Sequence, residues 1–530
     1  MTDAPDPSAA GDRSATDGPV VTGHPIEPGR PVVTGREARR ADPTAVTTAS
    51  SPVGDARSRA EVRQRTGRLP VAGVGIAMLV GLVTVVLGWF RLPAITRDTM
   101  WAEDVRLFLH QRIVLGPWAS LVQPYDGYQH LVPRILTDTA VLVAPIERYA
   151  MTVTLLALAA VGLTAAATFA FSAGLVRTRT ARIALALIPV LLPISANEAL
   201  GNLANLHWFA LYLAPFILLH RPATRTRAVF QTVLVLLVAG TEIQTVVFVP
   251  LLALMLRRRR VWSVGIAYLV GLAGQFGALL TTPRVRSEET PVLLADAVRG
   301  FFAEPSLSLW VHDGPRAATL LAQHGVPVLA AAFAPFAVAL VAAVAARWSG
   351  RSLLAVVLAV GAVAVWFADV LLNPNGLLEF SARGWAVLAA EGFVRYALVP
   401  SMFLAALLVV GADRLLAAGG GRCLAVGGDG RLASGADGRL AVGEGVRGGA
   451  VALRVVGVLV LVGLAGGLTT AYEPLSTSRS GGPDWRTSVR TAEQACASVG
   501  GVGRQRIEGA PSGWGVSLSC ADIDGDRRFP

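Results

Sequence analysis

The 530-residue chain contains no lysine, few charged residues and only three cysteines. Charged residues make up 16% of the sequence and hydrophobic residues 53%, whereas a soluble globular protein carries roughly 25% charged residues. The mean hydropathy is +0.54. These values argue against a soluble protein and predict an all-α, polytopic membrane protein.

Without lysine, the formal net charge of +11 comes from arginine alone. Arginine in a membrane protein collects in cytoplasmic loops, so topology explains the excess and we expect no nucleic-acid partner. The absence of lysine beside abundant alanine, glycine and arginine suggests a bacterial genome rich in G and C.

The motifs of several enzyme classes are also missing. No Walker sequence, Rossmann fingerprint, HExxH pair or Gly-x-Ser-x-Gly elbow stands in a suitable setting, so nucleotide hydrolysis, zincin proteolysis and hydrolase chemistry lack support. No apolar stretch begins near Met1, and we expect no cleavable signal peptide. Residues 1–68 are rich in Pro, Asp, Thr, Ser, Ala and Gly, which predicts a disordered cytoplasmic tail.

Eleven apolar runs approach the roughly 20 residues that a membrane-spanning helix needs. If the N-terminal tail lies on the cytoplasmic side of the membrane, eleven crossings keep the arginine groups on that side and place the C-terminus on the outer side. The predicted spans are residues 71–90, 149–176, 183–195, 206–220, two short spans within 228–256, and then 261–280, 326–346, 353–372, 396–416 and 451–470.

Residues 228–256 allow two interpretations. A single long span would place the four arginines of residues 257–260 outside. Two short spans that turn near Glu242 keep these arginines inside, and we favour that arrangement.

The predicted domains follow from these spans. Residues 69–416 form the membrane domain with helices in its outer loops, residues 417–450 a Gly-rich cytoplasmic linker, 451–470 the last span and 471–530 a small outer tail. Cys423 falls in the linker, while Cys496 and Cys520 fall in the outer tail. Because an oxidising compartment allows disulfides, we predict that Cys496 and Cys520 are joined.

Two adjacent carboxylates, Glu103 and Asp104, follow the first span and the interfacial residue Trp101. Ionisable groups next to the bilayer are costly and usually lie in a polar cavity with a function. A partly desolvated carboxylate can serve as a general base. Helical neighbours point about 100° apart, so we expect one acid to do the chemistry and the other to position. The alternative is a solvated loop pair that merely ends the span.

A second outer cluster contains Tyr125, Tyr128 and His130. Aromatic faces stack on sugar rings, while the polar tips of Tyr and His bond to hydroxyl groups. The alternative is an ordinary interfacial turn. Arg134 either holds a phosphate or pairs with Asp138, one helical turn away.

A third outer patch combines Glu198, Asn202, Asn205, His207 and Trp208. The spacing of its first three members, by four and three residues, predicts that they share one helical face. Cap and loop chemistry is the alternative. The patch lacks a strong set of metal ligands, so we predict no cofactor, although the sequence leaves room for a divalent cation.

A fourth pair, Arg395 and Tyr396, precedes the tenth span. A guanidinium makes bidentate contacts to phosphate, and Arg395 suits a lipid-linked phosphate at the outer boundary. The alternative is an arginine that reaches the lipid headgroups.

In these residues the chain resembles the polytopic GT-C-type glycosyltransferases, which use polyprenyl-phosphate sugars outside the cytoplasmic membrane. Trp101-Ala-Glu-Asp104 matches the acid that these enzymes place directly after their first span. The motif Pro124-Tyr-Asp-Gly-Tyr128, followed by Arg134, and the Asn-x-x-Asn-x-His-Trp patch ending at Trp208 are similar to bacterial members. The resemblance covers roughly residues 71–410.

The resemblance implies an inverting transfer of a sugar to an envelope glycan, lipid or protein, within membrane lipids. It makes Asp104 the base that deprotonates the acceptor hydroxyl, and Arg395 or Arg134 the holder of the polyprenyl phosphate. Many members carry a large outer domain, whereas about 60 residues remain here, which leaves acceptor recognition open.

Two alternatives use the same residues differently. A transporter or flippase for a lipid-linked or polar precursor needs ionisable residues at mid-membrane depth. The charged residues here cluster at the outer ends of spans, with Asp369 and Glu242 as exceptions. A non-catalytic scaffold for envelope assembly predicts no cost from losing Asp104.

Overall fold

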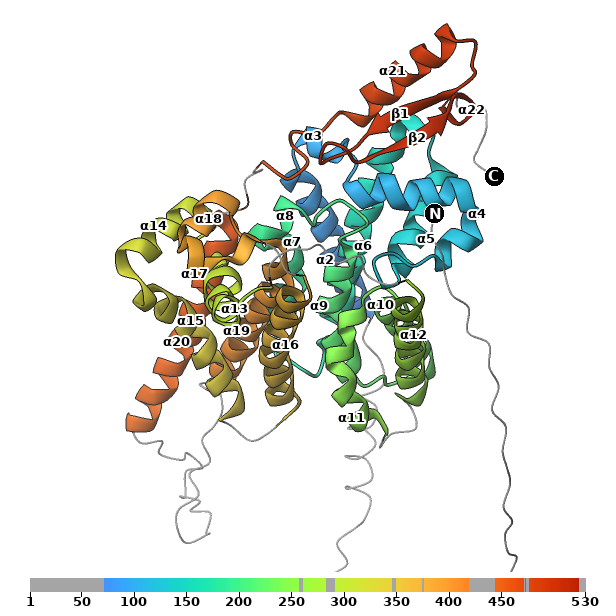
Figure 1. Cartoon of the computed structure of the whole chain (residues 1–530). Coiled ribbons are helices and arrows are strands. Elements are labelled where there is room, and N and C mark those ends of the chain that lie inside the picture. The colour runs from blue at the N-terminus through green and yellow to red at the C-terminus, as the bar shows by residue number, and fades with distance from the viewer. Residues whose placement is uncertain are drawn as a thin grey trace, which may run out of the picture. The chain divides into compact units, whose positions relative to one another are not determined.

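The computed structural model describes residues 71–256, 261–282, 291–345, 349–373, 376–418, 444–470, 472 and 476–523. All of them belong to one compact unit, residues 63–530. The predicted disordered tail, the arginines of 257–260 and Cys423 lie outside the described residues. The described residues are mostly helical (Figure 1).

Seven helical segments of the described chain are long and apolar enough to cross a membrane. They fall on seven of the eleven predicted spans. These helices are α2 (Val71–Arg91), α6 (Tyr149–Phe171), α7 (Arg179–Leu191) with α8 (Pro193–Asn197), α12 (Trp262–Thr281), α15 (Val326–Val344), α16 (Gly350–Leu372) and α19 (Leu398–Ala418).

Three of the other four predicted spans coincide with shorter helices, and the last coincides with the 27-residue α20 (Glu444–Thr470), whose apolar stretch is Arg454–Thr469. The shorter helices are α9 (Leu206–Leu219), α10 (Arg225–Ala239), and the pair η3 (Ile243–Leu251) and α11 (Leu252–Leu256).

The path of residues 225–281 favours the two-span interpretation. Thr232 in the middle of α10 bonds to Ser263 near the start of α12, at 3.0 Å. At the other end of α10, the carbonyl oxygen of Ala239 accepts a hydrogen bond from Gln275 of α12. Because α10 and α12 therefore run in parallel, η3 and α11 between them run back. The chain reverses next to Glu242, as two short spans require.

Small residues allow the long helices to approach closely. A Cβ atom on Gly81 of α2 would lie 2.8 Å from the carbonyl oxygen of Gly162 in α6, so the two backbones touch. Helix α19 packs against α7, α15, α16 and α20 and is buried along almost its whole length. It forms the axis of the helical unit.

The segments predicted to face the cytoplasm meet at one end of α19. Asp413, in the last turns of this helix, accepts hydrogen bonds from the backbone N–H groups of Arg177 and Thr178 at 2.8 and 2.9 Å. Arg351 lies 3.9 Å from the same carboxylate.

The segments predicted to lie outside meet at the other end. The backbone N–H of Ser478 donates to the carbonyl of Asn197, and that of Trp485 to the carbonyl of Asp98, both at 2.8 Å. The 18 residue-to-residue steps from Arg395 to Asp413 rise about 27 Å at 1.5 Å per step. This length suits the hydrocarbon core of a bilayer, about 30 Å thick.

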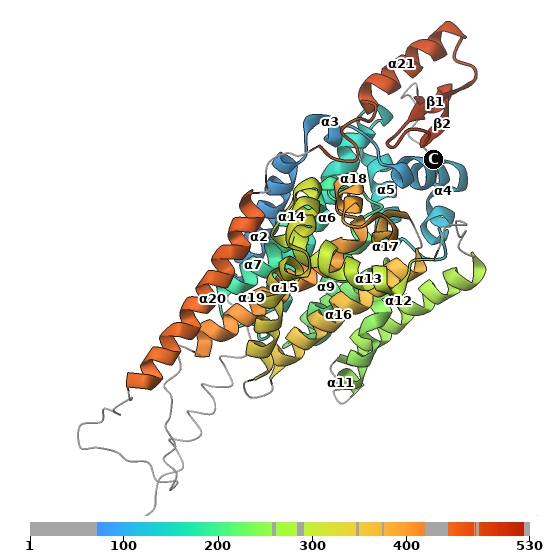
Figure 2. The ribbon, with the colours of Figure 1, turned by 60° about the vertical axis from the view of Figure 1, so that its left-hand side comes forward.

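Short helices fill the predicted outer segments. They are α3 (Ala94–Arg97), η1 (Asp104–Leu109), α4 (His110–Val122), α5 (Leu131–Val143), η2 (Ile146–Arg148), α13 (Leu294–Phe301), η5 (Phe302–Ser306), η6 (Leu307–Leu309), α14 (Gly314–His324), η7 (Gly376–Leu378), α17 (Phe380–Arg383), α18 (Ala386–Glu391) and η8 (Arg395–Ala397). Helices α14, α17 and α18 lie together (Figure 2).

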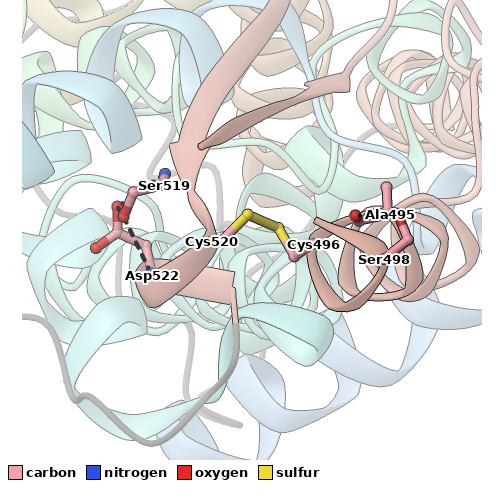
Figure 3. The surroundings of a disulfide bond; sticks show 6 residues. All are labelled: Ala495, Cys496, Ser498, Ser519, Cys520 and Asp522. Atoms are coloured by element: carbon pink, nitrogen blue, oxygen red, sulfur yellow. Dashed lines mark hydrogen bonds between the residues drawn. A yellow bond between two sulfur atoms is a disulfide. The ribbon is translucent and has the colours of Figure 1, made fainter. Parts of the chain in front are cut away.

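Residues 476–523, here called the C-terminal module, correct the all-α prediction. Helix α21 (Trp485–Ser498) packs on an antiparallel hairpin of β1 (Arg504–Glu508) and β2 (Gly515–Ser519), followed by α22 (Cys520–Ile523). A disulfide joins Cys496 of α21 to Cys520 (Figure 3), the pairing that the sequence predicts. The predicted outer tail is therefore a small folded module.

Candidate functional site

A polar cavity of about 210 Å³ lies where the predicted outer patches meet. Eight of the residues predicted to bind substrate line it, although they come from three separate parts of the sequence. They are Tyr125, Tyr128, His130, Asn205, His207, Trp208, Arg395 and Tyr396. Glu103 lines the same cavity, so the fold brings these patches together around an acid.

Glu103 presents an unsatisfied carboxylate to this cavity. Within the described residues, its Oε2 is buried and has no hydrogen-bond partner. Burial raises the pKa of Glu103 above its usual 4.5, although its own backbone N–H and Arg395 act in the opposite direction. A carboxylate with a spare oxygen and a raised pKa is suited to accept a proton from a bound hydroxyl group.

Asp104 has a different environment. It is fully buried, it does not line the cavity, and its two oxygens accept the backbone N–H groups of Leu203 and Ala204 at 2.9 and 2.8 Å. Burial raises the pKa of Asp104 to about 7 despite these two bonds. A general base must first be within reach of the proton. The geometry therefore does not favour Asp104 as the base, and makes Glu103 the better candidate.

A tight turn directs two tyrosines at the cavity. Tyr125 and Tyr128 exchange backbone hydrogen bonds of 3.0 and 3.1 Å. Between them, Asp126 and Gly127 both have positive φ, 49° and 81°, as a type I′ turn requires and as Asp-Gly readily adopts. The ring of His130 lies 4.1 Å from that of Tyr128.

His130 contributes an unpaired ring nitrogen. The side chain is 3% exposed, and its Nδ1 has no hydrogen-bond partner in the described part of the chain. Burial, together with His207 and Arg134, lowers the pKa of His130 well below 6.5. The imidazole is therefore neutral near pH 7 and can bond to a hydroxyl group of a ligand.

The loop 198–205 is not the helix that its spacing predicts. Gly201 has a φ of 76°, and the side-chain amides of Asn202 and Asn205 donate to the carbonyl oxygen of Glu198. Asn202 is buried behind the loop. Asn205 lines the cavity and accepts the indole N–H of Trp208 at 3.1 Å. The predicted helical face is replaced by a loop that its own asparagines hold.

A chain of hydrogen bonds forms a further wall. Nδ1 of His207 bonds to Glu242, whose other oxygen accepts the backbone N–H of Gln244 at 2.7 Å. The side chain of Gln244 in turn donates to Asp369. Glu242 and Asp369, the two exceptions in the predicted charge pattern, both line the cavity.

The two predicted phosphate ligands differ. Arg395 lines the cavity, and its Nη1 lies 2.9 Å from the carboxylate of Glu198. Arg134 donates to Gln111 and to the carbonyl of Ser120 and does not line the cavity.

The predicted pair between Arg134 and Asp138 is also wrong. Asp138 binds Arg112 instead. The contacts of Arg134 link it to Gln111 and Ser120, and its predicted role in holding a phosphate stays a prediction.

Sequence reasoning missed several members of the cavity wall. Trp101, which the sequence places at the membrane interface, lines the cavity, as do Gln244 and Asn373, which belong to no predicted cluster. The signal for Glu242 and Asp369 was present, because an acid within an apolar run is expensive and usually functional. Among the described residues, no group of three or more His, Cys, Asp or Glu side chains is arranged to hold a metal ion.

No protein-family model and no curated protein matches this chain. Its function therefore has to be inferred from the chemistry of the cavity.

Proposed function

We propose that this protein is a membrane glycosyltransferase that moves a sugar from a polyprenyl-phosphate donor to a cell-envelope acceptor on the outer face of the membrane. One observation carries the proposal. Residues of three distant segments, each suited to sugar or phosphate, line a single cavity together with Glu103, whose buried Oε2 has no hydrogen-bond partner among the described residues.

The cavity wall has the composition of a sugar site. The rings of Tyr125, Tyr128, Trp208 and Tyr396 offer apolar faces for stacking, with polar tips for hydroxyl groups. The volume of about 210 Å³ is below the roughly 300–1,000 Å³ of pockets that enclose drug-sized ligands. It suits one sugar ring better than a whole lipid-linked donor, whose chain would remain in the bilayer.

In the proposed reaction, Glu103 takes the proton of the acceptor hydroxyl group. The acceptor oxygen attacks the anomeric carbon as the bond from that carbon to the phosphate oxygen breaks, and polyprenyl phosphate leaves with the electron pair. Attack opposite the leaving group inverts the anomeric centre. Arg395 is 46% exposed and pairs with Glu198, and in the proposed complex the exposed part of its guanidinium binds the phosphate.

The position of two acids weakens the transporter alternative. A translocation path would use ionisable groups at mid-membrane depth. Glu242 and Asp369, the candidates for such a path, both lie at the cavity instead.

The test uses purified protein in sealed vesicles with a polyprenyl-phosphate sugar that is radiolabelled in the sugar, and an envelope extract as acceptor. We expect the label to leave the lipid and to enter the acceptor fraction, and the Glu103→Gln variant to slow this transfer about 10²- to 10⁴-fold. If the labelled lipid instead crosses the bilayer with its sugar bond intact, the transporter alternative replaces the proposal.

A further inference from the structure

Arg479 of the C-terminal module reaches into the base of the candidate site. Its side chain is buried, with 3% exposure. Nη1 donates to the carbonyl oxygens of Thr99 and Gly201, at 3.3 and 3.0 Å, and Nη2 donates to that of Leu200 at 2.6 Å. One guanidinium thus connects two loops that are about a hundred residues apart in the sequence.

These two loops carry cavity residues. The first continues from Thr99 to Glu103, and the second from Leu200 to Asn205; Glu103 and Asn205 line the cavity. Asp104 joins the same loops from within, because it accepts the N–H groups of Leu203 and Ala204. In the second loop, the carbonyl groups of Leu200 and Gly201 therefore bond to the C-terminal module. The backbone N–H groups of Leu203 and Ala204 bond to Asp104 of the first loop.

Holding two loops together with a buried cation costs free energy, because the charged group loses its hydration by water. The planar fork of arginine can bridge several carbonyls with fixed geometry, which lysine cannot do. Although burial lowers the pKa of Arg479 to about 10, the side chain stays charged near neutral pH. The segment before it is itself anchored, since the N–H of Ser478 donates to the carbonyl of Asn197 at 2.8 Å.

We infer that Arg479 is a positioning residue that fixes the loops 99–104 and 200–205 so that Glu103 and Asn205 face the cavity. The C-terminal module is then a template for the site and not a passive tail. The consequence for catalysis rests on the proposed function, whereas the effect on loop order does not.

The test compares Arg479→Met and Arg479→Lys with the matched control Arg490→Met. Arg490 lies in the same module but is 62% exposed and pairs with Glu147, away from the cavity. Melting temperature and retention of the Cys496–Cys520 disulfide in each purified variant identify those that fold. If Arg479→Met fails to fold, Arg479→Lys, which keeps the charge, carries the test.

The first readout is hydrogen exchange at the amides of Leu203 and Ala204, with those of α6 as reference. We expect exchange about 10-fold faster or more in Arg479→Met, a smaller increase in Arg479→Lys and no change in Arg490→Met. Wild-type exchange at these amides in a folded Arg479 variant would overturn the inference.

The second readout is sugar transfer. Misplacement by about 1 Å can cost about 100-fold in rate, so we expect kcat to fall 10- to 100-fold in Arg479→Met, with KM within about twofold and partial rescue in Arg479→Lys. An unchanged kcat beside faster exchange would contradict the catalytic part. Faster exchange in a protein whose wild type transfers no sugar would refute the proposed function and leave the positioning role supported.

Discussion

The two ends of the helical unit each bury a carboxylate, and they treat it differently. Asp413, near one end of α19, is 1% exposed and accepts hydrogen bonds from the N–H groups of Arg177 and Thr178 and from the hydroxyl of Thr178. Glu103, at the other end, has a buried oxygen without a partner in the described residues and faces a cavity. A satisfied buried carboxylate cross-links the fold, whereas an unsatisfied one next to a cavity marks a site.

The same contrast separates two sequence neighbours at the cavity end. Asp104 resembles Asp413, because both of its oxygens accept backbone N–H groups. Glu103, one residue earlier, does not. The local environment, and not the position after the first span, therefore distinguishes the structural acid from the candidate catalytic acid.

The largest effect that we expect is on catalysis at Glu103. Glu103→Gln keeps the shape of the side chain and removes its basicity, so the rate of sugar transfer should fall about 10²- to 10⁴-fold. The free energy of unfolding should stay within about 0.5 kcal/mol, because no hydrogen bond of Oε2 is lost. Transfer kinetics and unfolding in detergent micelles check both halves. A wild-type rate would remove Glu103 from the chemistry.

The next effect concerns stability at the opposite end. Asp413→Ala removes three part-buried hydrogen bonds to a charged group. The free energy of unfolding should therefore fall by about 3–5 kcal/mol. The transfer rate, normalised to the folded fraction, should not change. A variant of wild-type stability would show that this carboxylate does not cross-link the fold.

Asp104→Asn should have the smallest effect of the three. An asparagine side chain accepts one of the two N–H groups and turns its own amide against the other, at a cost of about 1–3 kcal/mol. We expect the transfer rate to fall less than in Glu103→Gln. A larger fall without loss of stability, measured in the same two assays, would restore Asp104 as the base.

Much of the site could be predicted, because the order of the membrane spans alone places the outer loops at the same end of the helical unit. The patches around Tyr125, His207 and Arg395 line one cavity. Their predicted location on the same side of the membrane is consistent with this. The choice between Glu103 and Asp104 could not be made, because it depends on amides of Leu203 and Ala204, about a hundred residues later.

Other failures come from local competition. The spacing of Glu198, Asn202 and Asn205 fits a helix, but asparagine side chains that bond to nearby backbone compete with helical structure. Asp138, which the one-turn spacing predicts to pair with Arg134, pairs with Arg112 instead. Arg479 carried no signal, since its three acceptors are backbone carbonyls that any sequence provides.

The dependence of kcat/KM on pH tests the role of Glu103 most directly. A general base works only when it is ionised, and burial raises the pKa of Glu103 above 4.5. Activity should therefore be lost as the pH falls through this raised pKa, with a midpoint above 4.5, and this acid limb should be absent from the residual activity of Glu103→Gln. An acid limb that persists in Glu103→Gln, or one with its midpoint at or below 4.5 in the wild type, would contradict the account.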